Sequence, residues 1–222
     1  GSKKDNRTVM GILNANRNAF LQGLWQTVIL TVFAIVLASI WGILLGVMGV
    51  SQLPWIRAIS TTIIYLFRGL PLMVLAFFIY IGLPGVIGTK IPAFTAGLLT
   101  LILNEGAYTA AFVRGGFEAV DHGQMEAARS LGLPYSKSMR RVIMPQGLKI
   151  MIPSFINQFI ITLKDTSILS AIGILELTQT GSLIVSRNSQ GFRVWAIVAV
   201  IYLIVITLLT WLSNWVEKRT RA

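Results

Sequence analysis

Long uncharged stretches alternate with short basic connections along this chain, and this pattern predicts helices that cross a membrane. The hydrocarbon core of a bilayer is about 30 Å thick, and a helix of about 20 apolar residues spans it. No charged residue occurs between Asn18 and Ile56. The pattern therefore predicts a first span over Leu21–Val50 and further spans over Ala58–Leu83, Pro92–Val113 and Val194–Val216.

The stretch that precedes the last span is less regular. Its uncharged part, Ile150–Leu163, is short enough for a re-entrant segment. Including Val142–Lys149 gives the length of a span, with Lys149 near the interface. We expect five spans, with four spans and one re-entrant segment as the alternative. The predicted fold class is an all-α integral membrane protein with about five transmembrane helices.

Composition supports a lipid environment. The chain has 222 residues, of which 55% are hydrophobic and 12% charged, and its mean hydropathy is +0.73. Soluble domains carry about 25% charged residues. The net charge of +11 does not indicate nucleic-acid binding, because the basic residues lie between apolar runs rather than clustering on one solvated face. With no cysteine and a lone histidine, His122, no metal site is predicted.

Basic residues in the connections set the predicted orientation. The connection between the third and fourth spans carries six of them, more than any other. Lys and Arg accumulate in cytoplasmic loops, and placing this connection in the cytoplasm gives ten basic residues inside and eight outside. The basic N-terminal tail opposes this assignment. The connection with the most basic residues decides the predicted orientation, which places the N-terminus outside and the C-terminus in the cytoplasm.

The predicted organisation is one transmembrane domain over residues 21–217. A tail over 1–20 precedes it, for which an interfacial position is open, and a basic tail over 218–222 follows it. Small residues recur at a spacing of four, as in Gly42/Gly46 and Gly106/Ala110. Such pairs let helices approach closely in lipid. We expect packing within one subunit, with a subunit interface as the alternative.

The connection over 118–145 contains a short helix with a signal at each end. Asp121 is a good N-cap, and Gln124 stands where it completes a capping box. Gly132 suits a left-handed C-terminal cap, and Pro134 prevents continuation of the helix. A rigid projecting helix with small side chains suits docking against another protein, whereas an idle surface helix is the alternative.

The spacing in this connection resembles a known motif. Glu126-Ala127-Ala128, three residues, Gly132, nine residues and then Val142-Ile-Met-Pro145 are similar to the EAA loop of ABC importer permeases, with Val142 and Met144 in place of Ile and Leu. Further stretches resemble the polar amino-acid subfamily of the histidine, arginine and glutamine type: Phe67-Arg-Gly-Leu-Pro71, Gly106-Ala-Tyr108, Arg114-Gly115, Pro145-Gln146, Asn157-Gln-Phe159 and Lys164-Asp-Thr-Ser167.

The resemblance implies a transport subunit without chemistry of its own. In that family the short helix couples the permease to an ATPase, which assigns ATPase coupling to Glu126, Ala127, Ala128, Gly132 and Pro145. It also implies a homo- or heterodimer of permeases, an extracytoplasmic amino-acid-binding protein, alternating access and a bacterial inner membrane. The chain has no phosphate-binding loop. ATP and Mg²⁺ are therefore expected on the partner subunit, and no cofactor on this chain.

Polar residues inside the predicted spans are candidates for substrate binding, because such residues are costly in lipid. A helix puts Glu105, Tyr108, Thr109 and Phe112 on one face, where a carboxylate would hold a cationic cargo. Many relatives instead carry an acid at the position of Ala111. The candidate substrate-binding residues are Arg68, Asn104, Glu105, Tyr108, Lys164 and Asp165.

Each charged candidate has an alternative role. Glu105 is expected to face a basic amino acid, or else to pair internally with Arg68 or Lys164. Lys164 and Asp165 suit a structural or gating pair better than a specificity role. Arg68 is placed to meet a substrate carboxylate or to snorkel to an interface.

Two other functional classes fit the sequence less well. An ion-coupled carrier or channel that acts without an ATPase is the alternative function. An intramembrane protease is disfavoured because the lone histidine lies outside the spans.

Overall fold

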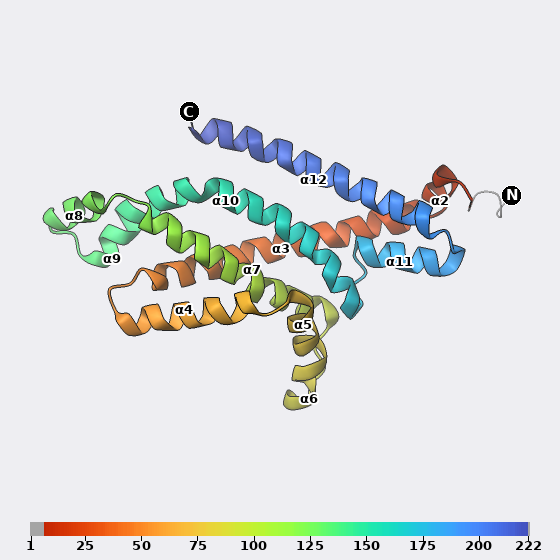
Figure 1. The fold of residues 1–222 in the computed structure, drawn as a ribbon, viewed down its shortest axis with the longest axis horizontal. Coiled ribbons are helices and arrows are strands. Elements are labelled where there is room, and N and C mark those ends of the chain that lie inside the picture. The colour runs from red at the N-terminus through yellow and green to blue at the C-terminus, as the bar shows by residue number, and fades with distance from the viewer. Residues whose placement is uncertain (1–6, 222) are drawn as a thin grey trace. The chain divides into compact units, whose positions relative to one another are not determined.

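The computed structural model describes residues 7–221, and within them it is built from helices without a strand (Figure 1). Residues 1–6 and 222, the outer ends of the two predicted tails, lie outside the described residues. The elements are α2 (Val9–Ala15), α3 (Arg17–Gly49), α4 (Pro54–Gly69), α5 (Leu72–Phe77), η1 (Phe78–Gly82), α6 (Leu83–Ile87), α7 (Ala93–Glu118), α8 (His122–Ser130), α9 (Tyr135–Ser138), η2 (Met139–Ile143), α10 (Met144–Asp165), η3 (Thr166–Ile172), α11 (Leu177–Asn188) and α12 (Gly191–Arg221).

Three long apolar helices match the first, third and fifth predicted spans. They are α3 with 33 residues, α7 with 26 and α12 with 31, and at 1.5 Å per residue each is long enough to cross a bilayer. Two further candidate spans are pairs of helices joined at a short break: α4 with the run from α5 to α6, and the run from α9 to η3 with α11. Counting each pair once gives five spans, as the sequence predicts.

The sequence allows either a full span or a re-entrant segment before the last span. In the structure this stretch is helical from Tyr135 to Ile172. Within it α10 alone has 22 residues. A π-helical turn, η2, precedes α10, and a 3₁₀ turn, η3, follows it. The charge at Lys149 therefore lies in the second turn of a continuous helix rather than in a loop.

The second predicted span is interrupted between Gly69 and Leu72. Leu70 has an extended backbone, with φ −92° and ψ 130°. The residue before a proline is disfavoured in the helical region, so Pro71 explains why α4 ends here. The last carbonyl groups of α4 thereby lose their intrahelical partners and need donors from elsewhere.

The chain divides into two compact units, which we describe separately. Unit 1 comprises residues 1–34, 72–101 and 160–214, and unit 2 comprises 35–71, 102–159 and 215–222. The division falls inside α3, α7, α10 and α12, so each of these helices contributes to both units.

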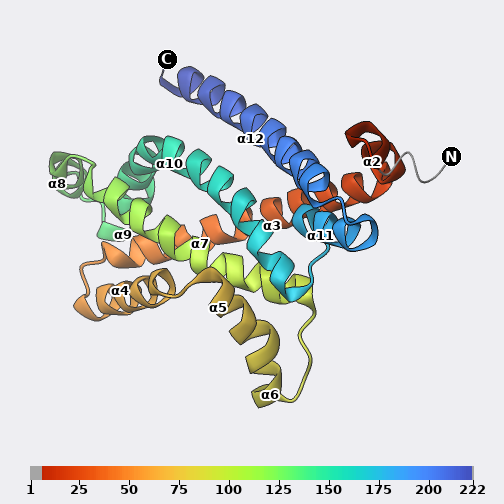
Figure 2. The same cartoon turned by 45° about the vertical axis from the view of Figure 1, so that its right-hand side comes forward.

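The core of unit 1 joins α2, the first turn of α3, α11 and the start of α12, which lie side by side in both ribbon views (Figures 1 and 2). It is formed by Ile12, Phe20, Leu177, Ile184, Val194, Ile197 and Val198. Ile12 is fully buried and Phe20 is 3% exposed. Residues 9–20, which the sequence assigns to the N-terminal tail, therefore include folded structure that forms part of the core of unit 1.

A buried carboxylate organises the beginning of α11 in unit 1. Glu176 is fully buried, and its carboxylate accepts hydrogen bonds from the backbone N–H of Thr178 (2.9 Å) and Gln179 (2.7 Å) and from the Tyr202 hydroxyl (2.9 Å). The first N–H groups of a helix have no intrahelical acceptor. Glu176 is thus an N-cap that also ties α11 to α12.

We expect Glu176→Ala to lower the free energy of unfolding by about 1–3 kcal/mol, because it leaves two partly buried N–H groups without an acceptor. Tyr202→Phe is the matched control: it removes one bond from the same carboxylate and should cost about 1 kcal/mol. Thermal unfolding in detergent measures both. Equal losses in the two variants would contradict the capping role.

In unit 2 the small residues of α3 and α7 pack against each other. A Cβ atom at Gly42 would lie 2.5 Å from Thr109 Cβ, one at Gly46 would lie 2.4 Å from Val113 Cγ1, and one at Gly106 would lie 2.6 Å from Trp41 Cδ1. These distances leave no room for any side chain. The Gly42/Gly46 pair therefore mediates packing within the subunit, as expected.

Candidate substrate site and coupling surface

Two of the polar candidates on α7 hold the broken end of α4 in unit 2. Asn104 is 5% exposed, and its Nδ2 donates to the carbonyl oxygens of Phe67 (3.1 Å) and Leu70 (3.5 Å). The Tyr108 hydroxyl donates to the carbonyl oxygen of Arg68 at 3.4 Å. These donors replace the intrahelical partners that the break removes. Asn104 and Tyr108 therefore position the segment that carries Arg68.

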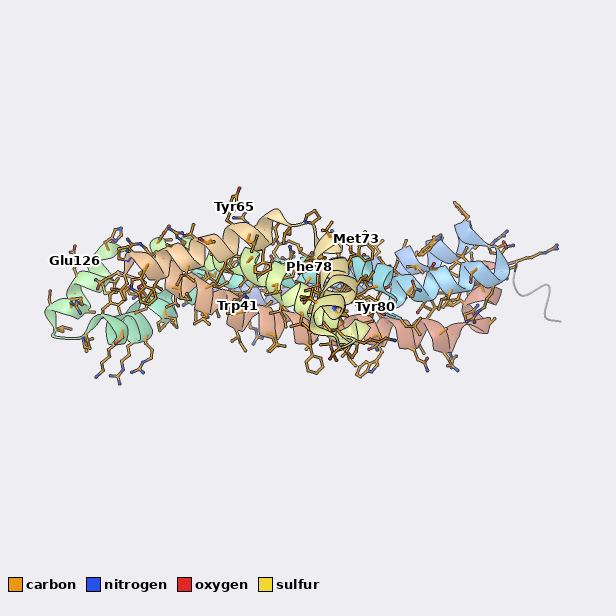
Figure 3. All side chains as sticks on the ribbon, turned by 90° about the horizontal axis from the view of Figure 1, so that it is seen from below. Trp41, Tyr65, Met73, Phe78, Tyr80 and Glu126 are labelled. Atoms are coloured by element: carbon orange, nitrogen blue, oxygen red, sulfur yellow. The ribbon has the colours of Figure 1, made fainter. Side chains whose placement is uncertain are left out.

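The Arg68 side chain is exposed and lies over an aromatic ring. Its guanidinium carbon is 5.2 Å from the centroid of the Tyr108 ring, a cation–π contact. On the same helix Tyr65 is 82% exposed, and Figure 3 shows its phenol projecting away from the ribbon of α4. Arg68 and Tyr108 thus form one cluster on the accessible side of the α4 end.

The remaining polar candidate on α7, Glu105, is buried and faces another helix. It is 1% exposed, and Gln158 on α10 donates a hydrogen bond from Nε2 to its carboxylate. Thr109, one turn further along α7, packs against Gly42 on α3 instead. The residues expected on one face of α7 therefore point in three directions: towards α4, α3 and α10.

Lys164 and Asp165 end α10 and belong to unit 1. Lys164 is exposed and Asp165 half-buried. The Lys164 carbonyl oxygen accepts a hydrogen bond from the Ser167 hydroxyl at 2.7 Å, which stabilises the change from α10 to the 3₁₀ turn η3. Arg68, Asn104, Glu105 and Tyr108 lie in unit 2.

The predicted short helix in the connection over 118–145 is α8. Its N-cap is Asp121, whose carboxylate accepts from the Gly123 N–H at 2.8 Å. The second half of the predicted capping box does not form. The Gln124 side chain instead accepts a hydrogen bond from Gln146 Nε2 at 3.2 Å, which joins α8 to the start of α10.

The end of α8 has the predicted left-handed cap. Gly132 has φ +85°, and its N–H bonds the Arg129 carbonyl oxygen at 3.0 Å while the Leu133 N–H bonds the Ala128 carbonyl oxygen at 3.3 Å. Glycine adopts this conformation without steric cost. The helix therefore ends where the sequence indicates.

The two small residues of α8 differ in exposure to solvent. Ala128 is 4% exposed and faces the chain, whereas Glu126, Ala127 and Pro145 are exposed. Figure 3 locates Glu126 on α8. We call the exposed set Glu126, Ala127 and Pro145 the coupling surface. The coupling surface is accessible to another protein. The buried side of α8, at Ala128, packs against the rest of the chain.

Contacts that the sequence did not suggest brace α8 and α9. The Tyr135 hydroxyl donates to the Val50 carbonyl oxygen at 2.8 Å. A separate ion pair, with Arg114 Nε 3.2 Å from Glu118 Oε1, lies within the last turns of α7. Tyr135 was not a candidate, because a polar side chain that bonds a distant carbonyl group leaves no local pattern.

The sequence and fold agree with a known group of membrane proteins. Residues 38–222 match the family described as the inner membrane component of binding-protein-dependent transport systems. The chain belongs to this family. The permease is 33% identical over 210 residues to the probable glutamine ABC transporter permease protein GlnM of Bacillus subtilis, which covers 95% of this chain and 97% of the relative.

Two further comparisons agree. The permease is 37% identical over 169 residues to the glutamine transport system permease protein GlnP of Escherichia coli, covering 75% of this chain and 77% of the relative. A solved structure described as an amino acid ABC transporter with histidines has a TM-score of 0.85 and 37% identity, covering 93% of this chain and 96% of the other. The permease is therefore a membrane-spanning transport subunit of an amino-acid ABC importer rather than an enzyme.

Proposed function

We propose that this permease moves a polar amino acid with a cationic side chain inward by alternating access, and that Glu105 recognises that side chain. The observation that carries the proposal is the burial of the Glu105 carboxylate on α7, a membrane-spanning helix. A buried carboxylate is costly unless positive charge or hydrogen bonds offset it. A cationic cargo adds a charge–charge interaction with this carboxylate that a neutral cargo does not supply, which favours the cationic cargo.

The cluster of Arg68 and Tyr108 at the end of α4 supplies a positive charge that is complementary to the cargo carboxylate. Arg68 is a cation on the exposed side of a membrane helix, and such a residue faces a polar pathway or a protein partner rather than lipid. We propose that Arg68 binds the cargo carboxylate, with Asn104 and Tyr108 holding its backbone in place. Lys164 and Asp165 are proposed as a gating pair.

The family and the coupling surface support a proposal for the assembly. We propose that two permease subunits, identical or different, pair with two ATPase subunits that hold ATP and Mg²⁺. An extracytoplasmic binding protein delivers the cargo. Glu126, Ala127 and Pro145 contact the ATPase, while Ala128 and Gly132 shape the helix that carries them. The N-terminus lies outside a bacterial inner membrane and the C-terminus lies in the cytoplasm.

The cargo class can be tested with one isosteric change. We expect Glu105→Gln to reduce arginine uptake by at least tenfold and to leave glutamine uptake within about twofold, because the shape is kept and only the charge is lost. Proteoliposomes with the complete transporter and binding protein, assayed with both amino acids, measure this. Gln158→Leu is the matched control, because it removes the hydrogen bond to the carboxylate and keeps the charge.

The rival role of Glu105, an internal ion pair, gives a different result. Glu105→Gln would then lower expression and basal ATP hydrolysis, and neutralising Arg68 or Lys164 as well would restore both. A well-folded variant in which arginine and glutamine uptake fall together would show that Glu105 does not select the cargo. The glutamine transport named for two relatives makes glutamine the neutral competitor to use.

A further inference from the structure

A groove of about 480 Å³ lies within unit 2, between the first turns of α10 and the last turns of α12. In both ribbon views the last turns of α12 stand apart from α10, with open space between the two ribbons (Figures 1 and 2). Neither the coupling surface nor the candidate substrate residues line it. Its lining is polar at Gln146, Lys149, Glu217 and Thr220 and apolar at Ile150 and Pro153, among others.

The polar and apolar parts of the groove follow the depth of a bilayer. The chain enters the membrane along α10, so Gln146 and Lys149 lie nearer the coupling loop than Pro153 does. On α12 Trp215 is 52% exposed, and the Arg219 guanidinium lies 4.5 Å from the centroid of a Trp215 ring. Exposed tryptophan beside a basic residue is typical of the level of lipid headgroups. The groove therefore extends from the headgroup level towards the hydrocarbon.

The groove lining carries one cation, Lys149, and one acid, Glu217. Lys149 is exposed and forms no ion pair with any residue in the described part of the chain. Lys218 and Arg219 are exposed on the same turn of α12 that borders the groove. The one acidic residue among the lining side chains, Glu217, is already engaged in an interaction within the chain. Lys218 and Arg219 make the surface beside the groove net positive, which favours an anionic occupant.

We propose that this groove binds one anionic phospholipid of the cytoplasmic leaflet, such as phosphatidylglycerol. The phosphate lies at Lys149, and the first methylene groups of the acyl chains lie along Ile150, Ile152 and Pro153. An apolar wall below a cation suits a phospholipid better than free phosphate, because inorganic phosphate would leave that wall wetted. The bound lipid also borders the coupling machinery, since Gln146 donates to Gln124 on α8.

Lipid competition on the complete transporter tests this proposal. Delipidated complex is offered equal amounts of phosphatidylglycerol and phosphatidylcholine, and retained lipid is counted by native mass spectrometry. We expect the wild type to prefer phosphatidylglycerol and Lys149→Gln to lower that preference about fivefold, the factor expected for one lysine near an anionic headgroup. Lys137→Gln, the matched control, removes the same charge outside the groove and should leave the preference unchanged.

A variant that fills the groove distinguishes lipid bound in the groove from nonspecific attraction of anionic lipid to the basic surface. Ile152→Trp should remove the retained phosphatidylglycerol without changing the charge. Equal loss in Lys149→Gln and Lys137→Gln, or no preference in the wild type, would overturn the proposal. It would also fall if Thr220→Cys crosslinked to another permease or ATPase subunit, because protein would then occupy the groove. Free phosphate that displaces the lipid at millimolar concentration would show an inorganic anion site instead.

Discussion

Replacing Gly46 by leucine is expected to leave almost no correctly folded permease. A Cβ atom at this position would lie 2.4 Å from Val113 Cγ1, 2.9 Å from Val113 Cβ and 3.3 Å from the backbone nitrogen of Arg114. Overpacking a filled site costs about 1–3 kcal/mol, and more when the backbone must move. Because a leucine side chain adds three carbons beyond the Cβ, we expect a loss above about 3 kcal/mol.

The yield of monodisperse protein in detergent and its unfolding temperature measure this effect. Gly115→Leu is the matched control, because the same substitution on α7 meets no atom within 4 Å of its Cβ. A second variant isolates the contact: in Gly46→Ala/Val113→Ala the smaller partner should restore much of the stability that Gly46→Ala loses. A stable Gly46→Leu protein would show that α3 and α7 do not pack at this point.

The second large effect is expected at the coupling surface. Ala127→Arg should abolish cargo-stimulated ATP hydrolysis while the permease stays folded, because a long charged side chain prevents α8 from seating in a partner groove. Ala127 is exposed, so the substitution disturbs no contact within the chain. Reconstituted transporter, assayed for ATP hydrolysis with and without cargo, measures the loss. Ala119→Arg, at an exposed position outside α8, is the matched control.

Gly132→Val tests the same surface through its support. Valine is strained at φ +85°, so the end of α8 must rearrange. We expect slower transport with normal assembly. If Ala127→Arg retained full stimulation by cargo, α8 would not be the element that contacts the ATPase, and an idle surface helix would be the better interpretation.

The spans were predictable because the length of an uncharged stretch can be read directly from the sequence. The uncharged run from Asn18 to Ile56 indicates α3 directly. Caps were equally visible at Asp121 and Gly132, because a cap depends on a few neighbouring residues. The break in the second span was also indicated, since Pro71 restricts Leu70 through local sterics alone.

What the sequence did not indicate depends on contacts between distant residues. α2 has only seven residues, too few for a periodic signal, and the burial of Ile12 arises from packing against α11 and α12. Gln124 meets the capping-box pattern, yet its side chain bonds Gln146, 22 residues away. Helical periodicity grouped Glu105 with Thr109, but three different neighbouring helices determine where the side chains of α7 point.

The π-helical turn at Met139–Ile143 gives a physical meaning to the fixed spacing between Gly132 and Pro145. One residue advances an α-helix by about 100°, and a π turn accommodates a single extra residue without ending the helix. Deleting one residue here would let ordinary helix form and would rotate α8 and α9 about the α10 axis. Glu126 and Ala127 would then face a different direction relative to Pro145, which lies on α10 beyond the turn. An insertion or deletion in this segment is therefore expected to reorient the α8 part of the proposed ATPase contact without changing any of its side chains.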